Sequence, residues 1–505
     1  MHLRAVGCLA VGAVLVVASA PSASPLQAKP RTAAASSTEG TKLLRNRGGQ
    51  SARYTGVGQL EGVRTCTAWL VETVRRAPAY AISSGRCSTS SPSETIVNRR
   101  AKGMTIEFRR FVDTPGARLK VRVKRIVFAS AKGLDLSIYA LGPSLRVFRA
   151  RGIQPLRISP GSPGGGRKVE TVGIPVAGVR RKERMLRRSG CTTRPRTRRL
   201  LEDSWVWYHV IPSNCRGIVG GSLGSPLIDR RSGNVLGVVN TTTLFGERLP
   251  ACYAGRPCEI RGGDSLRPRR NTTYAIPTSG LRACISLSGR FRLGGACPLD
   301  RRPWLTSTAP PVGVNPDVPD PVTGLPQTTW NVRLAGRLAY YRTKVGPAGT
   351  TDCRTSDGYG TPVALAQAPT YDAPLPLQNG RWVLCIVAGP TPQPDQRWQP
   401  VGKATTIVRY IDRSRPTQRI RVRVRESLGG STVEPVFDLP DHAHFAIKIG
   451  PLATALCTDP AGYHTYTGVP FRIPPTQQPA RVCIRSWDEA GNEAMTIWQR
   501  PVDGR

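Results

Sequence analysis

The sequence is poor in acidic residues, in histidine and in metal-binding patterns. Asp and Glu number 32 against 73 Lys and Arg, so the formal net charge is +41 at pH 7. Such an excess of positive charge favours adhesion to anionic polymers or surfaces at low salt. His209 is the single histidine between residues 51 and 300, and the alternating strand pattern around it indicates a structural role. Because the chain has no Cys-x-x-Cys pair and no Cys/His cluster, we predict no metal site and no cofactor.

Long stretches with a helical hydrophobic period are also absent, whereas Pro, Gly and short runs with Val, Thr and Arg are frequent. That composition favours all-β domains. After the first 28 residues, no segment is apolar enough to cross a bilayer as a helix. A chain of 505 residues is too long for a single core, so we expect two to four domains.

The N-terminus has the pattern of a secretory signal. Residues 1–28 combine a short basic start, an apolar run and the small residues Ala18-Ser-Ala20, and residues 29–50 form a polar, flexible lead-in. Cys8 lies in the signal, which leaves twelve cysteines for the mature chain. An even number at paired spacings predicts disulfides in an oxidising compartment. We therefore expect a secreted, extracellular protein, either free or held at the cell wall by charge.

One glycine-rich stretch organises the chain. The segment Gly220-Gly-Ser-Leu-Gly-Ser-Pro226 resembles the nucleophile loop of trypsin-like (chymotrypsin-fold) serine proteases, in the variant that ends Ser-Gly-Ser-Pro. Its end, Gly224-Ser225-Pro226, sets the register and assigns the nucleophile position to Leu223. Gly221 and the backbone N–H of Leu223 correspond to the oxyanion-binding turn, which implies a nest that could hold a carboxylate or carbonyl oxygen.

Two further motifs support the resemblance, which covers about residues 54–297. Cys66-Thr-Ala-Trp-Leu-Val71 and Ala79-Tyr-Ala-Ile-Ser-Ser-Gly-Arg-Cys87 are similar to the cysteine-clamped loop that carries the family's histidine, and here that position is Arg86. Gly133-Leu-Asp-Leu-Ser-Ile-Tyr-Ala-Leu141 resembles the strand that carries the family's aspartate, which implies that Asp135 holds this position. The resemblance implies a double β-barrel over residues 51–300.

The family's mechanism needs a serine nucleophile, a histidine base and an aspartate that orients the histidine. Leucine has no nucleophilic atom, and arginine stays protonated and has no acceptor nitrogen. We therefore predict no catalysis by the usual route. Because an unpaired buried carboxylate is costly, we expect Arg86 to form a salt bridge with Asp135 in the former active centre. The alternative is that Arg86 points into solvent.

The C-terminal half begins with a Pro-rich segment, residues 301–328, that reads as an extended linker. Beyond it a pattern occurs twice, once around Cys353 and Cys385 and once around Cys457 and Cys483. Each unit is similar to the immunoglobulin-like or fibronectin-like modules of exported bacterial proteins, which implies β-sandwiches over residues 329–412 and 413–505. The predicted fold class is thus all-β, a chymotrypsin-like double barrel followed by two immunoglobulin-like modules.

Disulfide connectivity cannot be deduced from sequence alone. Cys66 and Cys87 match the family's clamping pair, and nearest-neighbour spacing within each proposed domain predicts one pairing throughout. The predicted pairs are Cys66–Cys87, Cys191–Cys215, Cys252–Cys258, Cys284–Cys297, Cys353–Cys385 and Cys457–Cys483.

The basic residues are patterned. Cations alternate with apolar residues over 118–124 and again over 419–425, so a strand at either place would carry its cations on one face. The segment 180–199, which we predict to be a loop, is also strongly basic. The alternative interpretation is solvated strand faces and edge protection. The candidate anion-binding residues are Arg118, Lys120, Arg122, Lys124, Arg180, Arg181, Lys182, Arg419, Arg421, Arg423 and Arg425.

These observations favour a secreted, catalytically inactive protease homologue that binds an acidic polymer or anionic surface, such as a wall polymer or polysaccharide. A protein or peptide in the former cleft is a second class of partner. Nucleic acid is disfavoured, because no zinc-finger, RNP or KH signature is present. Two other functions stay open: a serine-type hydrolase that uses non-standard groups, and a structural or adhesion protein in which the barrels are a spacer.

Overall fold

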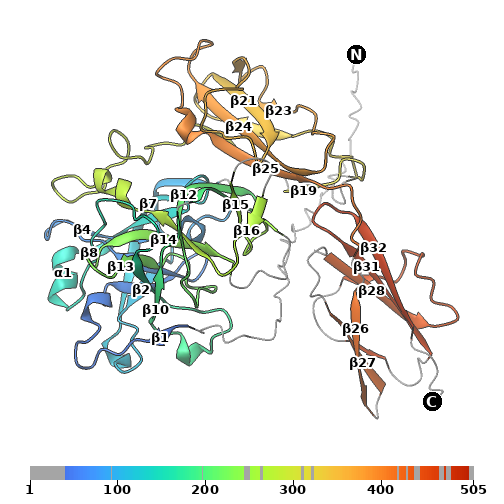
Figure 1. Ribbon diagram of the computed structural model, residues 1–505, viewed down its shortest axis with the longest axis horizontal. Helices are drawn as coiled ribbons and strands as arrows, with labels where there is room; N and C mark the ends of the chain where they lie inside the picture. The colour runs from blue at the N-terminus through green and yellow to red at the C-terminus, as the bar shows by residue number, and fades with distance from the viewer. Residues whose placement is uncertain are drawn as a thin grey trace, which may run out of the picture.

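The computed structural model (Figure 1) describes residues 40–91, 94–195, 197–243, 251–261, 266–308, 312–319, 324–417, 420–427, 430–436, 444–465, 471–473 and 479–499. The predicted signal, residues 1–28, lies outside them, as do residues 29–39 of the lead-in. Within these ranges strands predominate, and α1 (Leu145–Ala150) is the only α-helix. No described helix is both long and apolar enough to cross a membrane.

The first barrel closes because β7 pairs with β6 on one side and with β8 on the other. The closed order is β6-β2-β3-β4-β8-β7, and β5 pairs with β7 along the same edge as β6. Along β7 the buried Val121 and Val123 alternate with exposed cations, as the 2-residue period of a half-buried strand requires. The strands are β2 (Val57–Glu61), β3 (Cys66–Leu70), β4 (Pro78–Ser83), β5 (Thr95–Arg100), β6 (Thr105–Phe108), β7 (Leu119–Ser130) and β8 (Leu136–Ser144).

The second barrel follows the order β10-β9-β13-β14-β17-β12, and a bridge between Thr193 and Ser213 brings its two ends together. β1 extends the sheet at β10, while β11, β15 and β16 extend it beyond β12. The strands are β1 (Lys42–Leu43), β9 (Lys168–Gly173), β10 (Arg187–Thr192), β11 (Thr197–Glu202), β12 (Trp205–Ser213), β13 (Pro226–Asp229), β14 (Val235–Thr242), β15 (Cys258–Ile260), β16 (Leu266–Pro268) and β17 (Thr273–Pro277).

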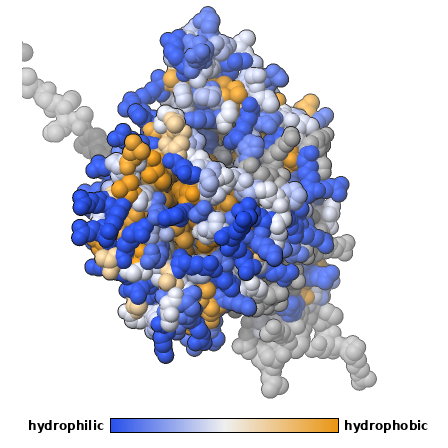
Figure 2. Space-filling model, turned by 60° about the vertical axis from the view of Figure 1, so that its left-hand side comes forward, coloured by the Kyte–Doolittle hydropathy of each residue, from blue (hydrophilic) through white to orange (hydrophobic). Residues whose placement is uncertain are grey.

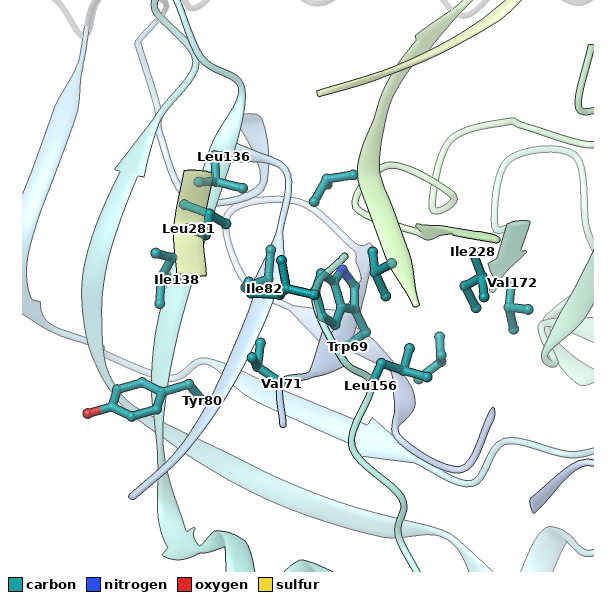
Figure 3. Packing of buried hydrophobic residues seen from close by; sticks show 14 of the residues in the cluster. Trp69, Val71, Tyr80, Ile82, Leu136, Ile138, Leu156, Val172, Ile228 and Leu281 are labelled. Atoms are coloured by element: carbon teal, nitrogen blue, oxygen red, sulfur yellow. The ribbon is translucent and has the colours of Figure 1, made fainter. Parts of the chain in front are cut away.

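One hydrophobic core joins the two barrels (Figure 3). Trp69 of β3 is fully buried, with Ile138 of β8 on the first-barrel side and Ile228 of β13 on the second-barrel side. Leu281 of the 3-10 helix η5 (Ser279–Cys284) packs into the same cluster. The predicted double β-barrel is therefore present, and its two halves share a continuous interior.

Two β-sandwiches follow, as predicted in outline. The first pairs β18 (Thr306–Ser307), β20 (Val332–Ala335) and β23 (Thr370–Tyr371) in one sheet. Its other sheet holds β19 (Gly313–Val314), β21 (Tyr340–Pro347), β22 (Val363–Ala364), β24 (Gly380–Gly389) and β25 (Thr405–Ile411). The second sandwich comprises β26 (Arg421–Ser427), β27 (Gly430–Val436), β28 (His444–Pro451), β29 (His464–Thr465), β30 (Phe471–Ile473), β31 (Ala480–Trp487) and β32 (Glu493–Gln499).

The segment predicted as a linker, residues 301–328, is partly integrated into the first sandwich. β18 pairs with β20, and β19 pairs with β25, so both short strands belong to its sheets. The composition is Pro-rich, but backbone groups on either side of the prolines still find strand partners. The prediction of a wholly extended linker between the barrels and the first sandwich is therefore wrong in part, because β18 and β19 belong to the sandwich.

The first sandwich also packs directly on the second barrel (Figure 1). One buried cluster contains Leu201 and Val206 from the barrel and Val383 and Trp398 from the sandwich. Arg199 donates hydrogen bonds across this contact to the carbonyl oxygens of residues 351 and 349, at 2.6 and 3.0 Å. All six predicted disulfides are present, one of them within each sandwich.

Candidate functional site

Arg86 lies on the short 3-10 helix η2 (Gly85–Cys87), directly after β4. Gly85 makes this turn possible, because a Cβ at that position would lie 1.9 Å from the carbonyl oxygen of Ser130. On the other side, the disulfide from Cys87 to Cys66 ties η2 to the start of β3. The Arg86 side chain extends from the first barrel toward β11 and β12 of the second, and it is only 9% exposed.

Asp135, at the start of β8, accepts two hydrogen bonds from Arg86. The backbone N–H donates to Oδ1 at 3.0 Å and Nε–H donates to Oδ2 at 3.1 Å. The hydroxyl of Ser84 donates to the same carboxylate at 2.7 Å, and Asp135 is fully buried. The predicted ion pair is thus present, and the alternative in which Arg86 points into solvent is wrong.

A second carboxylate, which the sequence interpretation missed, also contacts Arg86. Glu202 ends β11, and its Oε2 accepts from Nη1 of Arg86 at 3.2 Å. Its Oε1 accepts from the hydroxyl of Thr241 at 2.6 Å and from the backbone N–H of Gly255 at 2.7 Å. The Nη2 of Arg86 donates to the carbonyl oxygen of Asn240. The guanidinium thus has a different acceptor for each of its three nitrogens.

Two indole rings cover the guanidinium. Trp205 and Trp207 of β12 stack with their ring centroids 5.7 Å apart and their planes 12° apart. The Cζ of Arg86 lies 5.1 and 4.9 Å from these two centroids, which is within the range of cation–π attraction. The indole N–H of Trp207 donates to the carbonyl oxygen of Ala131 at 2.9 Å and so fixes that ring. Together these contacts surround the guanidinium, in agreement with its low exposure.

The electrostatics keep Arg86 charged. Burial alone lowers the pKa of Arg86, but attraction by Asp135 and Glu202 raises it above its ordinary value. Burial raises the pKa of Glu202, and the nearby Arg86 offsets only part of this effect. A guanidinium has no acceptor nitrogen, so the group at the histidine position cannot take a proton from a hydroxyl.

Leu223, which the resemblance assigns to the nucleophile position, lies in a tightly packed loop. The side chain of Leu223 packs against the apolar cluster around the Cys66–Cys87 disulfide, and its carbonyl accepts from the backbone N–H of Thr67 at 2.9 Å. Gly224 has a φ of +88°, and a Cβ there would lie 2.1 Å from Ser83 Oγ. Leu223 and Arg86 therefore both flank this disulfide. Gly221 also keeps a left-handed φ of +98°, as the oxyanion-type turn requires.

The serines beside Leu223 are engaged within their own loop. Ser225 is fully buried, and its hydroxyl donates to the carbonyl oxygen of Ser222 at 2.7 Å. Ser222 is 2% exposed, and its Oγ lies 3.4 Å from the backbone nitrogen of Val219. His209 is exposed on β12. These positions provide no open hydroxyl at the first-barrel edge of the loop.

The basic candidates differ in their environments. On β7 the predicted alternation is present, because Lys120, Arg122 and Lys124 are exposed while Val121 and Val123 are buried. Arg118 is half-buried, and its Nη2 lies 3.4 Å from the sulfur of Met185.

In the loop that starts at residue 180, Arg180, Arg181 and Lys182 are exposed, and Arg180 pairs with Glu183. Arg421 and Arg423 are exposed on β26. Arg419 and the side chain of Arg425 lie outside the described residues.

No protein-family model and no curated protein sequence matches the chain. Solved structures with partial similarity include a thermostable serine protease AL20 from an extremophilic microorganism, with 13% identity, a TM-score of 0.29 and coverage of 45% of this chain and 92% of that one. The human heparin binding protein has 14% identity, a TM-score of 0.29 and coverage of 48% and 91%. The protease Anisep from Arthrobacter nicotinovorans has 13% identity and a TM-score of 0.29, with coverage of 44% of this chain and 90% of that one. Similarity at this level carries no argument about activity or ligand.

Proposed function

We propose that this chain is a secreted, non-catalytic protein with a trypsin-like double barrel, and that it binds an acidic polymer outside the cell. The observation that carries the non-catalytic half is Arg86, which occupies the histidine position and bonds to Asp135 and Glu202 together. A triad needs a base that can lose and regain a proton, whereas this group is a permanent cation.

The nucleophile position gives the same answer independently. Leu223 has an alkyl side chain that packs against the apolar cluster containing Cys66 and Cys87, so position 223 offers no hydroxyl. Losing the base and the nucleophile together removes the mechanism, because members of a triad act as a unit. A hydrolase that uses other groups would need another nucleophile. Ser222 and Ser225, the serines beside position 223, are buried and form hydrogen bonds within their own loop.

The former cleft also gives less support to a peptide partner than to a surface ligand. Arg86, Asp135 and Glu202 are each less than 10% exposed, because the tip of the β11–β12 hairpin lies over them. The first sandwich packs against the outer side of that hairpin through the cluster containing Leu201 and Val206. A ligand that enters would have to displace both the hairpin and the sandwich.

The binding half of the proposal rests on the surface. The net charge of +41 is spread over many exposed cations, and Figure 2 shows hydrophilic side chains over most of one face, with smaller hydrophobic groups between them. Long-range attraction raises the local concentration of an oppositely charged polymer and its rate of association. Six disulfides are typical of an oxidising compartment, where acidic polysaccharides are available as partners.

A fluorophosphonate probe tests the non-catalytic half. We expect no labelling of the wild-type chain and none of the double variant Arg86→His/Leu223→Ser, because the double variant restores the side chains but leaves Glu202 and Trp205 over the site. Labelling of the wild-type chain at any serine would overturn the proposal. Labelling of the double variant alone would show that the centre is accessible and that only its residues are missing.

Retention on immobilised heparin, a sulfated polysaccharide, tests the binding half. We expect retention at about 0.15 M salt and a steep loss as salt rises, since screening shortens to about 3 Å at 1 M. A chain that passes through the column at physiological salt would contradict the binding role and favour a purely structural protein.

A further inference from the structure

We propose that the outer face of β7 and the adjoining turn form the binding site for a linear acidic polysaccharide. This inference rests on the proposed binding function and assigns it to one surface. We call this surface the basic face, and it is defined by six exposed cations. They are Arg100, Lys102, Lys120, Arg122, Lys124 and Arg125.

A rigid strand spaces these cations evenly. β7 is 12 residues long and is paired on both sides, with β5 and β6 along one edge and with β8 along the other. Lys120, Arg122 and Lys124 occupy alternate positions, so they are about 7 Å apart at roughly 3.3 Å per residue. A register shift between Val123 and Arg125 in the pairing with β8 leaves Lys124 and Arg125 exposed together. The paired backbone of β7 therefore holds these cations at regular positions along the strand.

A second row widens the face. Arg100 of β5 lies directly opposite Arg125 across the antiparallel pair. The backbone N–H of Ala101 donates to the carbonyl of Lys124 at 3.1 Å, so the turn that carries Lys102 is fixed against β7. Like charges that face each other across strands are destabilising. An arrangement of this kind is relieved when an anion binds between the cations.

Two acidic residues beside this face, Glu107 and Glu94, are paired with other cations, whereas Glu61, one strand beyond Thr105 in the row of Arg122, accepts a hydrogen bond from the hydroxyl of Thr65. Glu107, opposite Lys120 in the register, pairs with Arg110. Glu94 pairs with Arg99 at 2.8 Å. Across the part of the chain that the structure describes, no carboxylate forms an ion pair with Lys120, Arg122 or Lys124. These cations therefore stay available to an external anion.

The shape and composition of the basic face select the ligand class. The cations follow a strand, so they match a polymer that runs along it better than a compact anion. The outward neighbours on β6 and β5 include Thr105 and Asn98, and no aromatic side chain occupies an exposed position on β5, β6 or β7. Single-stranded nucleic acid is usually bound by stacking of its bases on aromatic rings, so an acidic polysaccharide fits better.

Two triple variants that remove equal charge test the assignment. Lys120→Gln/Arg122→Gln/Lys124→Gln neutralises the basic face, and Arg180→Gln/Arg181→Gln/Lys182→Gln neutralises the exposed loop elsewhere. We expect the β7 variant to weaken heparin binding at least tenfold at about 0.15 M salt and to lower the slope of log affinity against log salt by about two to three. We expect less than a twofold change from the loop variant. Lys120→Arg/Lys124→Arg keeps the charges and should bind as the wild type does.

The outcomes separate this inference from the proposed function. Equal losses in the two triple variants would overturn the basic face and leave binding by net charge. Absence of heparin binding by the wild-type chain would overturn the proposed function itself. Tighter binding to single-stranded DNA of equal charge, lost in the β7 variant, would overturn the polysaccharide as ligand. Matched thermal unfolding of both variants establishes that each is folded.

Discussion

The buried centre around Arg86 and the basic face both present arginine, with opposite consequences. Arg86 is buried, bonds to two carboxylates and a carbonyl, and lies against two indole rings. Arg122 is exposed on β7 and has no ion pair among the described residues. The same side chain type is structural in one place and available to a ligand in the other. A buried cation needs protein acceptors to replace its lost hydration, whereas an exposed cation stays hydrated and can bind an external anion.

This difference separates a structural role at Arg86 from the proposed binding role of the exposed cations. Nothing at the centre is left over for chemistry, since each nitrogen of the Arg86 guanidinium already has an acceptor. The cations of the basic face are instead aligned by a rigid strand and face solvent. We propose that the first group serves folding and the second serves binding, and the following variants test that division in order of expected effect.

The largest effect is expected at the centre. Arg86→Met leaves Asp135 and Glu202 buried without a cation, and breaking a buried pair of this kind costs about 3–5 kcal/mol. Denaturant unfolding measures the loss. If Arg86→Met unfolded at the wild-type midpoint, the ion-pair network would not be structural.

A matched variant separates the unpaired charges from the lost packing. Arg86→Met/Asp135→Asn/Glu202→Gln removes all three charges, so it should be more stable than Arg86→Met alone, because neutral groups of similar shape cost less to bury. If the triple variant were less stable than Arg86→Met, other groups in the protein would have to stabilise the buried charges of Asp135 and Glu202.

An intermediate effect is expected where only one partner is buried. Asp229 is 1% exposed, and Arg167 donates to it at 2.6 Å from a side chain that is 45% exposed. The hydrogen bond from Arg167 holds the pKa of Asp229 well below its ordinary value. A lowered folded-state pKa contributes stability above the unfolded pKa near 4, and this is lost as pH falls.

Asp229→Asn should therefore cost about 1 kcal/mol at pH 7, after allowance for solvent screening at Arg167. The difference from wild type should shrink toward zero as the pH falls from about 5 to 2. Unfolding at several pH values measures it, with Arg180→Gln as a surface control. A difference that is constant with pH would show that the pair is not what stabilises this turn.

The smallest effect on stability is expected at the basic face. Lys120→Gln/Arg122→Gln/Lys124→Gln should change the free energy of unfolding by less than about 0.5 kcal/mol, as is usual for exposed residues without partners. The same variant that weakens polymer binding most should thus be nearly neutral in folding. A loss above about 2 kcal/mol would place these cations in the structure rather than in the ligand site.

Local patterns in the sequence predicted much of this arrangement. Period-2 alternation correctly predicted the β7 cations on one face, and cysteine spacing correctly predicted the Cys66–Cys87 pair beside Arg86. The assignment of Leu223 to the nucleophile position stays a prediction. Nearest-neighbour spacing was sufficient for the disulfides, because each closes a loop within one domain. Each of these predictions depends on contacts within a strand, a turn or a short loop.

The contacts that seal the centre could not be predicted in the same way. Glu202 is 116 residues from Arg86 in the sequence, and it reaches the guanidinium only because the β11–β12 hairpin extends the second barrel's sheet beyond β12. The packing of the first sandwich against that hairpin depends on the pairing of whole sheets. The sequence did hold one signal for a further acceptor. A buried guanidinium has three nitrogens that need hydrogen-bond acceptors, and the predicted Asp135 alone does not supply them all.

The two kinds of cation can be compared in one experiment, by chemical modification of arginine with a dicarbonyl reagent under native conditions. After digestion, mass spectrometry measures the modified fraction at each arginine. We predict that Arg122 is modified rapidly and is protected by added heparin, whereas Arg86 is unmodified until the protein unfolds, because it is enclosed and its pKa is raised. Modification of Arg86 at a rate similar to that of Arg122 in the folded protein would contradict the central claim that this centre is a closed structural network.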